Sequence, residues 1–375
     1  MRQRPLSRRP SSHGSCLRLT SALAATLAVL CAAPHARADE KADGPELVIE
    51  DNDFLGPGGS DIQSTIPLLA NPHIKVLGFT VCAGDDWENA ESAHLRRFLE
   101  IAHHEDIPVA DGAVTPLINT VELMRLREQQ YGAIPWKGAW GGPGSMAKVP
   151  SSQPPLPKFT EGAPKTPAIA EPAAMFLIRM VHAHPHQVTI FEAGPMTNLA
   201  LAIRLDPTFA ATAKQLVFMG GLIDTNMMSI TGSANFASDF NMIFDPEAAH
   251  ITLTAAWPSI TVVGNVSNDI MMTKPYMARI ASKNTPVTSY MSRNFSPLPL
   301  WDEMAAAIAA DPSLVKQSVK AYMDVETTKG YSYGHAHVWP KDLAPVAMGV
   351  REVTLVQKID AEKFQETFVK QAQSL

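Results

Sequence analysis

The sequence has 375 residues, of which 46% are hydrophobic and 18% are charged, and its formal net charge is −6. This length and hydrophobic content are enough for one large domain with its own core. The excess of acidic side chains argues against nucleic acid or another polyanion as the partner, because like charges repel.

The first 38 residues have the pattern of an export signal. An arginine-rich lead is followed by an apolar run over 19–33, which is too short to span a bilayer as an ordinary helix. Ala36-Arg37-Ala38 then forms a small-x-small cleavage site. These features predict a signal peptide over 1–38, a mature chain that begins at Asp39, and a periplasmic or secreted protein without a membrane anchor. An uncleaved N-terminal anchor is the alternative.

Removal of this leader would change both the charge and the cysteine content. Residues 1–38 contain six of the 31 Lys and Arg and none of the 37 Asp and Glu, so the mature chain has 25 basic and 37 acidic residues, a net charge of −12. Cys82 would be the only remaining thiol, which excludes an internal disulfide. Cys82 ends an apolar run, and we expect it to be buried as a small hydrophobic residue.

Strand-like and helix-like runs alternate along the mature chain. The strand-like runs are 46–50, 75–82, 187–194, 215–221 and 259–266, and the helix-like runs are 88–106, 175–184, 197–205 and 245–256. Such alternation predicts a single α/β domain over 39–375 with a mostly parallel sheet and helices on both faces. Apolar strands between amphipathic helices are what a sheet covered on both faces requires.

Polar and glycine-rich segments follow several of these strands. They are "DNDFLGPGGSD" at 51–61, "CAGDD" at 82–86, "EAGPMTN" at 192–198 and "MGG" at 219–221. Ligands of open α/β sheets bind beyond the carboxyl ends of the strands. The topology therefore predicts that these four segments meet at one site.

The first of these segments carries Asp51, Asp53 and Asp61. Ser60 or Asp61 could cap the helix that follows, but one cap needs only one side chain. Several carboxylates at a strand end need a cation to offset their repulsion. An all-oxygen set of ligands suits Ca²⁺ or Mg²⁺, and the flexible geometry favours Ca²⁺. We therefore expect a Ca²⁺ site, with simple helix capping as the alternative.

Three later segments give the chain a resemblance to a known family. "GPMTNLALAIRLDP", "DFNMIFDPEAA" and "LWDEMAAAIAADPSLV" occur in this order. Over about residues 47–338 the chain resembles the inosine-uridine preferring nucleoside hydrolases. The usual opening motif of that family is Asp-Thr-Asp-Pro-Gly-x-Asp-Asp. Here "DND" replaces the first triplet and three extra residues precede Ser60-Asp61, which indicates a variant "DND" subgroup.

The resemblance implies a Rossmann-like α/β domain that holds one Ca²⁺ and hydrolyses the N-glycosidic bond of a ribonucleoside. By matching motifs, Asp53 is the expected general base and a metal ligand. The further metal ligands that the resemblance implies are Asp61, Asp302 and the main-chain carbonyl of Thr197. The residues that it implies for ribose binding are Asn235, Asp239 and Asn241. Many family members are dimers or tetramers, so the resemblance also implies a homo-oligomer.

Two positions depart from the family pattern. Trp301 stands where many members have a histidine that protonates the leaving base. Trp301 is expected either to stack on the base or to be a core residue at a helix start. Ser60 stands where an aspartate usually contacts ribose, and Asn52 is expected to replace part of this contact. The sequence does not reveal the base preference or the group that protonates the base.

The departures keep two other functions open. One is a ribose-binding or nucleoside-binding protein that has lost catalysis, and the other is a hydrolase of a different N-ribosyl compound.

The Pro- and Gly-rich stretch over 131–172 is longer than an ordinary connector. We expect a surface excursion that borders the site through Trp136 and Trp140, with a plain mobile loop as the alternative.

Overall fold

A sheet of nine strands organises the computed structural model, which describes residues 44–134, 136–141, 149–221 and 239–375. The strand order is β3-β2-β1-β4-β5-β6-β9-β7-β8. All neighbours from β3 to β9 are parallel, whereas β7 is antiparallel to both β9 and β8. The strands are β1 Glu46–Asn52, β2 Ile74–Val81, β3 Val109–Asp111, β4 Val188–Glu192, β5 Gln215–Met219, β6 Ile260–Val263, β7 Val315–Val325, β8 Ala336–Trp339 and β9 Arg351–Ile359.

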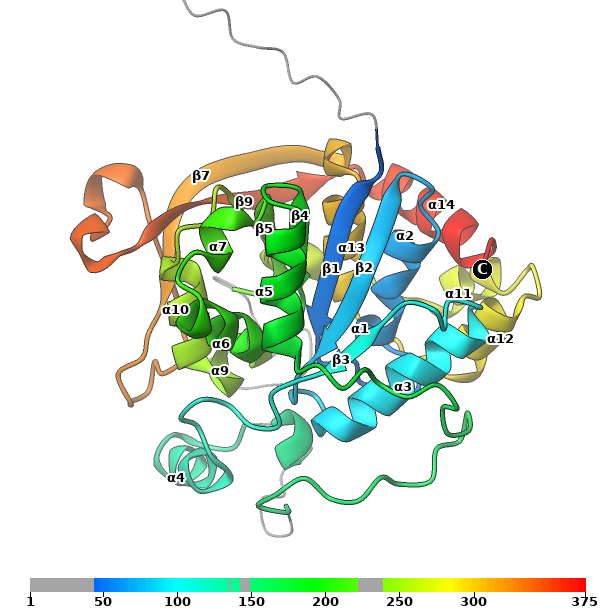
Figure 1. Cartoon of the computed structure of the whole chain (residues 1–375), viewed down its shortest axis with the longest axis horizontal. Coiled ribbons are helices and arrows are strands. Elements are labelled where there is room, and N and C mark those ends of the chain that lie inside the picture. The colour runs from blue at the N-terminus through cyan, green and yellow to red at the C-terminus, as the bar shows by residue number, and fades with distance from the viewer. Residues whose placement is uncertain (1–43, 135, 142–148, 222–238) are drawn as a thin grey trace, which may run out of the picture. The chain divides into compact units, whose positions relative to one another are not determined.

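Helices cover both faces of this sheet (Figure 1). The helices on the first face are α1 Ser60–Gln63, α2 Thr65–Leu69, α3 Glu88–Ile101, α11 Lys274–Ile280, α12 Pro286–Arg293, α13 Trp301–Ala310 and α14 Ala361–Ala372. Those on the second face are α5 Ala173–Ala183, α6 Thr197–Leu205, α7 Phe209–Thr212 and α10 Pro246–Thr254. Helices α4 Val121–Tyr131 and α9 Phe240–Phe244 share a smaller apolar cluster.

Each central strand contributes to both layers of the core. Val48 and Ile49 of β1 are both fully buried, but Val48 packs in the core of the first face and Ile49 in that of the second. Successive side chains of a strand point to opposite faces, so a sheet covered on both sides needs continuous apolar runs. The mostly parallel α/β sheet that the sequence predicted is confirmed. Cys82 is free and fully buried, as expected.

The Pro- and Gly-rich stretch divides into two different parts. Lys137 and Trp140 are buried, and the ring of Trp140 lies 4.6 Å from that of Phe244. The turn around Lys137 is therefore part of the packed structure. Residues 149–172, which we call the strap, form a surface segment that runs alongside α3 (Figure 1). Among the described residues, the strap is the part that has the character of the expected surface excursion.

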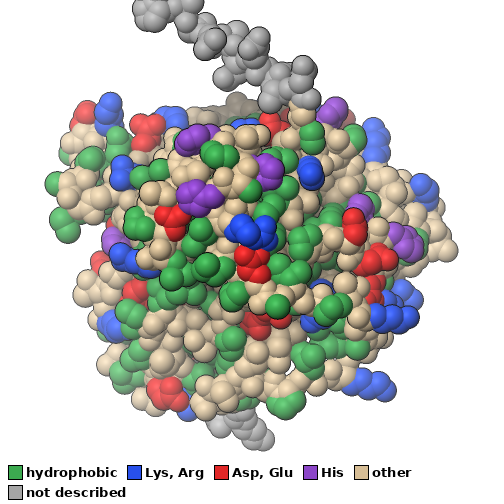
Figure 2. All heavy atoms as spheres, viewed as in Figure 1, with side chains coloured by type: hydrophobic (Ala, Val, Ile, Leu, Met, Phe, Trp, Pro, Cys, Tyr) green, Lys and Arg blue, Asp and Glu red, His purple; other side chains and the backbone are tan. Residues whose placement is uncertain are grey.

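Residues 1–38 lie outside the described residues, so the signal peptide stays a prediction. Within the described part of the chain, no helix has the length and apolar content to cross a bilayer. Acidic, basic and apolar side chains are intermixed on the face seen in Figure 2, where no continuous basic surface is visible.

The central strand carries a buried acid that makes stability depend on pH. Burial raises the pKa of Glu50 from 4.5 to about 8, although the Ser64 hydroxyl donates a hydrogen bond to it. Between these two values the folded protein retains a proton that the unfolded chain has released. The free energy of unfolding therefore falls as pH rises through this window.

We predict that Glu50→Gln removes part of this pH dependence. The neutral amide carries no charge to be desolvated, and each pKa unit corresponds to about 1.4 kcal/mol. Denaturant titrations from about pH 5 to about pH 9 should show a shallower loss of stability for the variant than for the wild type. Parallel curves would contradict a raised pKa at Glu50.

Candidate active site

The loops after β1, β2 and β4 meet around Asp53. The main-chain N–H of Asp85, which follows β2, donates to Asp53 Oδ2 over 2.8 Å. A Cβ atom at Gly194, which follows β4, would lie only 2.8 Å from Asp53 Oδ1. Asp53 itself is buried, with 1% of its surface exposed. The Asp53 side chain, expected to be the base, is thus fixed between the segments that follow β2 and β4, the two neighbours of β1. Glycine at position 194 lets the main chain after β4 approach Asp53 closely.

Asp61 and Asp302 lie beside Asp53, although they come from distant parts of the chain. Asp61 is in α1 and Asp302 is in the first turn of α13, and both are buried. Burial raises the pKa of each of the three carboxyl groups, and each of them also interacts electrostatically with at least one of the other two. The charge of Asp302 is the largest electrostatic contribution to the raised pKa of Asp61. The structure therefore places the three aspartates among the four predicted metal ligands in one buried region.

Asp85 is a fourth carboxyl group in this region and was not singled out from the sequence. Burial raises its pKa to about 7, although the indole N–H of Trp136 donates a hydrogen bond to it. Its charge acts on Asp53, Asp61 and Asp302. The available signal was its place in "CAGDD", directly after the strand that neighbours β1. Trp136 thus borders the site, as expected, whereas Trp140 is buried in the core.

Ser60 ties the first loop to α13. Its hydroxyl donates to Glu303 Oε2 over 2.6 Å and accepts from the main-chain N–H of Asp302 over 2.9 Å. Helix α1 begins after Gly59 without a side-chain cap, so the capping role considered for Ser60 or Asp61 is wrong. Glu303 was also missed by sequence reasoning, and burial raises its pKa to about 8. Ser60 therefore positions the first turn of α13, which carries Asp302.

Thr197 begins α6 and is held by a buried acid. Its hydroxyl donates to Asp245 Oδ2 over 2.8 Å, and the same oxygen accepts from the main-chain N–H of Leu117 over 2.9 Å. Burial raises the pKa of Asp245 to about 6. This bond fixes the start of α6 just after Gly194, the residue packed on Asp53. Thr197 follows Gly194 by three residues and therefore lies on a segment that reaches the site. Its main-chain carbonyl was expected to bind the metal from this segment.

The residues expected to bind ribose lie beside β4 and β5. Asn241 Nδ2 donates to the carbonyl of Ala193, at the end of β4, over 2.7 Å. Asp239 caps α9 and its Oδ2 lies 3.2 Å from the position of a Cβ atom at Gly220, at the end of β5. Both side chains are buried. The third expected residue, Asn235, lies outside the described residues.

Asn52 and Trp301 are engaged by the protein itself. Asn52 is fully buried, its Oδ1 accepts from the N–H of Asp53 over 2.8 Å, and its amide lies 3.4 Å from the carbonyl of Asp61. It supports the loop here, and the expected contact with the sugar stays a prediction. Trp301 is partly buried against the core, and its indole N–H donates to Asn268 Oδ1 over 2.8 Å.

The donor atoms of this region fit a divalent cation. Among the described residues, no three His, Cys, Asp or Glu side chains already have the arrangement of a finished metal site. However, Asp302 Oδ2 is buried without a hydrogen-bond partner. Carboxylate oxygens are the hard ligands that Ca²⁺ prefers. A cation would also offset the repulsion that raises the pKa of each aspartate, so Asp53, Asp61 and Asp302 fit the role of ligands.

Comparison with known proteins identifies the family. The inosine-uridine preferring nucleoside hydrolase family matches residues 48–366. The chain belongs to this family. It is 33% identical over 331 residues to an uncharacterized protein of Schizosaccharomyces pombe, covering 83% of this chain and 80% of the relative. It is 28% identical over 249 residues to an inosine-uridine preferring nucleoside hydrolase of Leishmania major, covering 66% and 69%. The protein is therefore a nucleoside hydrolase, which cleaves N-glycosidic bonds of nucleosides.

Solved structures of nucleoside hydrolases share the fold. A plant nucleoside hydrolase aligns with a TM-score of 0.67 at 23% identity, over 88% of this chain and all of its own. A purine-preferring ribonucleoside hydrolase from Gardnerella vaginalis also aligns with a TM-score of 0.67, at 18% identity, over 88% and 98%. At these identities the similarity establishes the fold, which is the α/β sheet described above.

We predict that Ca²⁺ stabilises the wild-type nucleoside hydrolase and that Asp302→Asn abolishes most of this gain. A ligand at about 100 times its Kd adds about 2.7 kcal/mol to the free energy of unfolding. Without Ca²⁺ the variant should be at least as stable as the wild type, because it removes one repelling charge. Thermal melts with and without Ca²⁺ measure both effects, and the exposed Asp342→Asn is the matched control. An equal Ca²⁺ shift in all three proteins would contradict the assignment.

Proposed function

We propose that this nucleoside hydrolase is an exported, Ca²⁺-dependent enzyme that converts ribonucleosides to ribose and free base. The observation that carries the proposal is the buried group of Asp53, Asp61 and Asp302 at the carboxyl end of the sheet, with Asp302 Oδ2 left without a partner. Three clustered acids without a cation would destabilise the fold, whereas the same acids around Ca²⁺ form a binding site.

The chemistry of N-glycosidic hydrolysis fits this acidic site. The bond breaks through a state in which the ribose ring carries positive charge, and nearby carboxylates stabilise that charge. When bound, Ca²⁺ would lower the pKa of a water molecule and orient it. Asp53 would serve as the general base for the attacking water. The hydrogen bond from the Asp85 N–H to Asp53 Oδ2 holds the carboxyl group in one orientation for proton transfer.

The sugar is the part of the substrate that the site can bind most specifically. A carboxylate at Asp239 and amides at Asn241 and Asn235 provide acceptors and donors for the ribose hydroxyls. A site built for hydroxyl groups discriminates against analogues that lack them, because its buried polar groups then stay unpaired. We therefore assign ribonucleosides, and not 2′-deoxyribonucleosides, as substrates.

Trp301 is proposed to contact the base. Its ring is only partly buried, and it precedes the proposed ligand Asp302 in α13. An aromatic face suits stacking on a planar base. Trp301 cannot donate a proton as a histidine would. From the "DND" at 51–53 and the three extra residues before Ser60, we also assign this chain to a variant "DND" group of the family. The proposal leaves the preferred base open.

Export is proposed from the leader sequence. The arginine-rich lead, the apolar run and the Ala36-Arg37-Ala38 site support cleavage after Ala38. A periplasmic or secreted hydrolase would release bases from extracellular nucleosides for salvage. N-terminal sequencing of the exported protein should begin at Asp39, and an intact N-terminus in a membrane fraction would contradict this part of the proposal.

We predict that Asp53→Asn lowers kcat by at least about 100-fold, the usual scale for loss of a general base. Release of ribose from inosine, uridine, adenosine and guanosine is measured with and without a chelator, and Asp342→Asn serves as the exposed control. The wild type and the control should hydrolyse at least one ribonucleoside and lose activity with chelator. The corresponding 2′-deoxyribonucleoside should react far more slowly.

Two results would point to the alternatives. Tight binding of nucleosides without turnover would indicate a binding protein and would sink the enzymatic proposal. Hydrolysis of another N-ribosyl compound, such as nicotinamide riboside, without hydrolysis of any of the four nucleosides would assign the enzyme to a different substrate class. Full activity of Asp53→Asn would remove Asp53 as the base while leaving the family assignment intact.

A further inference from the structure

Loop 54–59, "FLGPGG", connects two of the proposed metal ligands. Asp53 precedes it and Asp61 lies in the helix that follows it. Its three glycines give the free chain many conformations, so holding it in one path costs conformational entropy. Phe54 is the only large aromatic side chain in the loop, and it is fully buried at the loop's first position. Contacts from outside the loop help to set the path of its remaining residues.

His94 of α3 makes one of these contacts. Its ring lies against Gly56 so closely that a Cβ atom there would come within 2.5 Å of His94 Cγ. His94 is buried and also interacts electrostatically with Asp86, in the loop that carries Asp85. His94 thus lies against loop 54–59, and its charge acts on the loop that follows β2. Movement of the His94 ring would change the room available to loop 54–59 at its centre.

The ring of His94 is held in turn by the strap. His94 Nδ1 is hydrogen-bonded to Glu161 Oε1, and the two side chains are only 6% and 5% exposed. The ring of Phe159 packs edge-on against the His94 ring, with centroids 4.6 Å apart. The carbonyl of Glu161 accepts from Arg97 Nε over 2.9 Å. A polar pair this deeply buried has one preferred geometry, because losing the bond would leave both groups desolvated.

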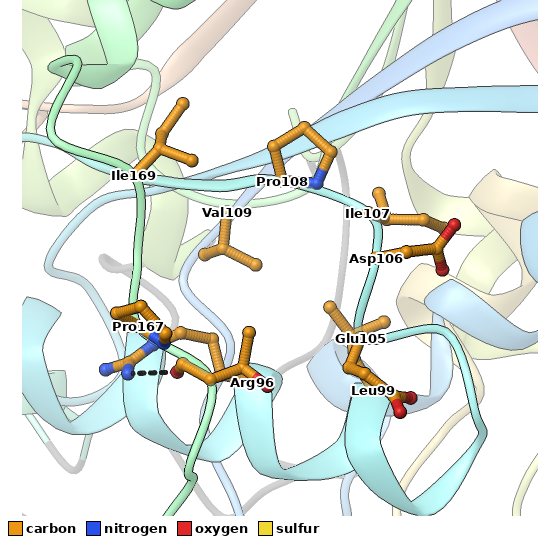
Figure 3. A pocket seen from close by; sticks show the side chains of 10 residues that line it. Arg96, Leu99, Glu105, Asp106, Ile107, Pro108, Val109, Pro167 and Ile169 are labelled. Atoms are coloured by element: carbon orange, nitrogen blue, oxygen red, sulfur yellow. Dashed lines mark hydrogen bonds between the residues drawn. The ribbon is translucent and has the colours of Figure 1, made fainter.

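Further contacts hold the strap along α3. The Arg96 guanidinium donates to the carbonyl of Thr166 over 2.9 Å, and Glu100 Oε1 accepts from the Thr166 N–H over 2.8 Å. Figure 3 shows Arg96 and Leu99 of α3 with Pro167 and Ile169 of the strap, all of which line a cavity of about 150 Å³. The strap is therefore anchored beyond Glu161 as well and does not depend on the His94 bond alone.

Helix α12 supports the other side of the loop. The hydroxyl of Tyr290 accepts a hydrogen bond from the N–H of Gly58 over 2.9 Å. A Cβ atom at Gly58 would come within 2.7 Å of Asn294. Tyr290 itself packs on Phe98 of α3, with ring centroids 5.3 Å apart. Loop 54–59 is thus held between α3 and α12, with His94 on one side and Tyr290 on the other.

We propose that His94, locked by Glu161, is a positioning residue that sets the path of loop 54–59 and hence the relative placement of Asp53 and Asp61. The proposal rests on the proposed function, since the two carboxylates are placed for a shared cation. The strap then has a specific structural role, because it fixes the metal-binding loop from a distance by way of one histidine. Neither His94 nor Glu161 touches the substrate or the cation in this role.

The test compares Glu161→Ala and Glu161→Gln with Glu171→Ala, which changes a strap glutamate bonded to Arg179 at the surface. Hydrogen exchange of residues 54–60 is measured without metal, and Ca²⁺ affinity is measured by calorimetry. Loss of a buried hydrogen bond should accelerate exchange and weaken Ca²⁺ binding by about 10-fold each in Glu161→Ala. Glu161→Gln, which keeps an acceptor oxygen, should recover most of both losses, and Glu171→Ala should match the wild type.

A second test uses the close approach at Gly56 and does not need the glutamate. Gly56→Ala should weaken Ca²⁺ binding by about 10-fold in the wild type, because its methyl group meets the His94 ring. In the His94→Ala background the ring is gone, and the same substitution should have a much smaller effect. Additive effects of the two substitutions on Ca²⁺ affinity would overturn the proposal.

The outcomes separate this proposal from the proposed function. Unchanged exchange over 54–60 in Glu161→Ala would overturn the positioning role whether or not the protein binds Ca²⁺. Faster exchange with unchanged Ca²⁺ affinity would also overturn it, since the loop would then be held without effect on the ligands. A wild type that binds no Ca²⁺ would sink the calcium-dependent function, and the positioning role with it.

Discussion

Burying several carboxyl groups at one end of a sheet costs free energy, because each group loses its water and each repels the others. In this nucleoside hydrolase the cost falls on Asp53, Asp61 and Asp302, which lie together beyond the strand ends. Bound protons or a divalent cation can offset it. Stability, pH and cation binding are therefore linked in one region, and the surrounding structure can be understood as the support that keeps these acids close.

Hydroxyl groups provide much of that support. Three buried carboxyl groups near the site each accept a hydrogen bond from a serine or threonine. The pairs are Ser64–Glu50, Ser60–Glu303 and Thr197–Asp245. A hydroxyl donor satisfies a buried acid without adding a charge, so it fixes geometry while leaving the net negative potential of the site intact. That potential is what attracts a cation and favours positive charge on a ribose ring.

Much of the fold could be predicted because its signals are local. The alternation of apolar strands and amphipathic helices specified the parallel sheet, and the place of "DND" and "CAGDD" after strands specified where their side chains would meet. The hydrogen bonds of Ser60 and Asn52 could not be predicted for the opposite reason. Both residue types form caps and sugar contacts equally well in a sequence, and only their packed neighbours show that each is bonded within the protein.

The sequence by itself determined the fold class, the family and the identity of the acids that gather at the site, because periodicity and motifs are properties of neighbouring residues. Only the tertiary structure decided that Asp85 and Glu303 join those acids, and that His94 and Glu161, 67 residues apart, form a buried pair beneath the first loop. Such contacts depend on which loops pack together. The whole core sets that packing, so it cannot be predicted from any short segment of the sequence.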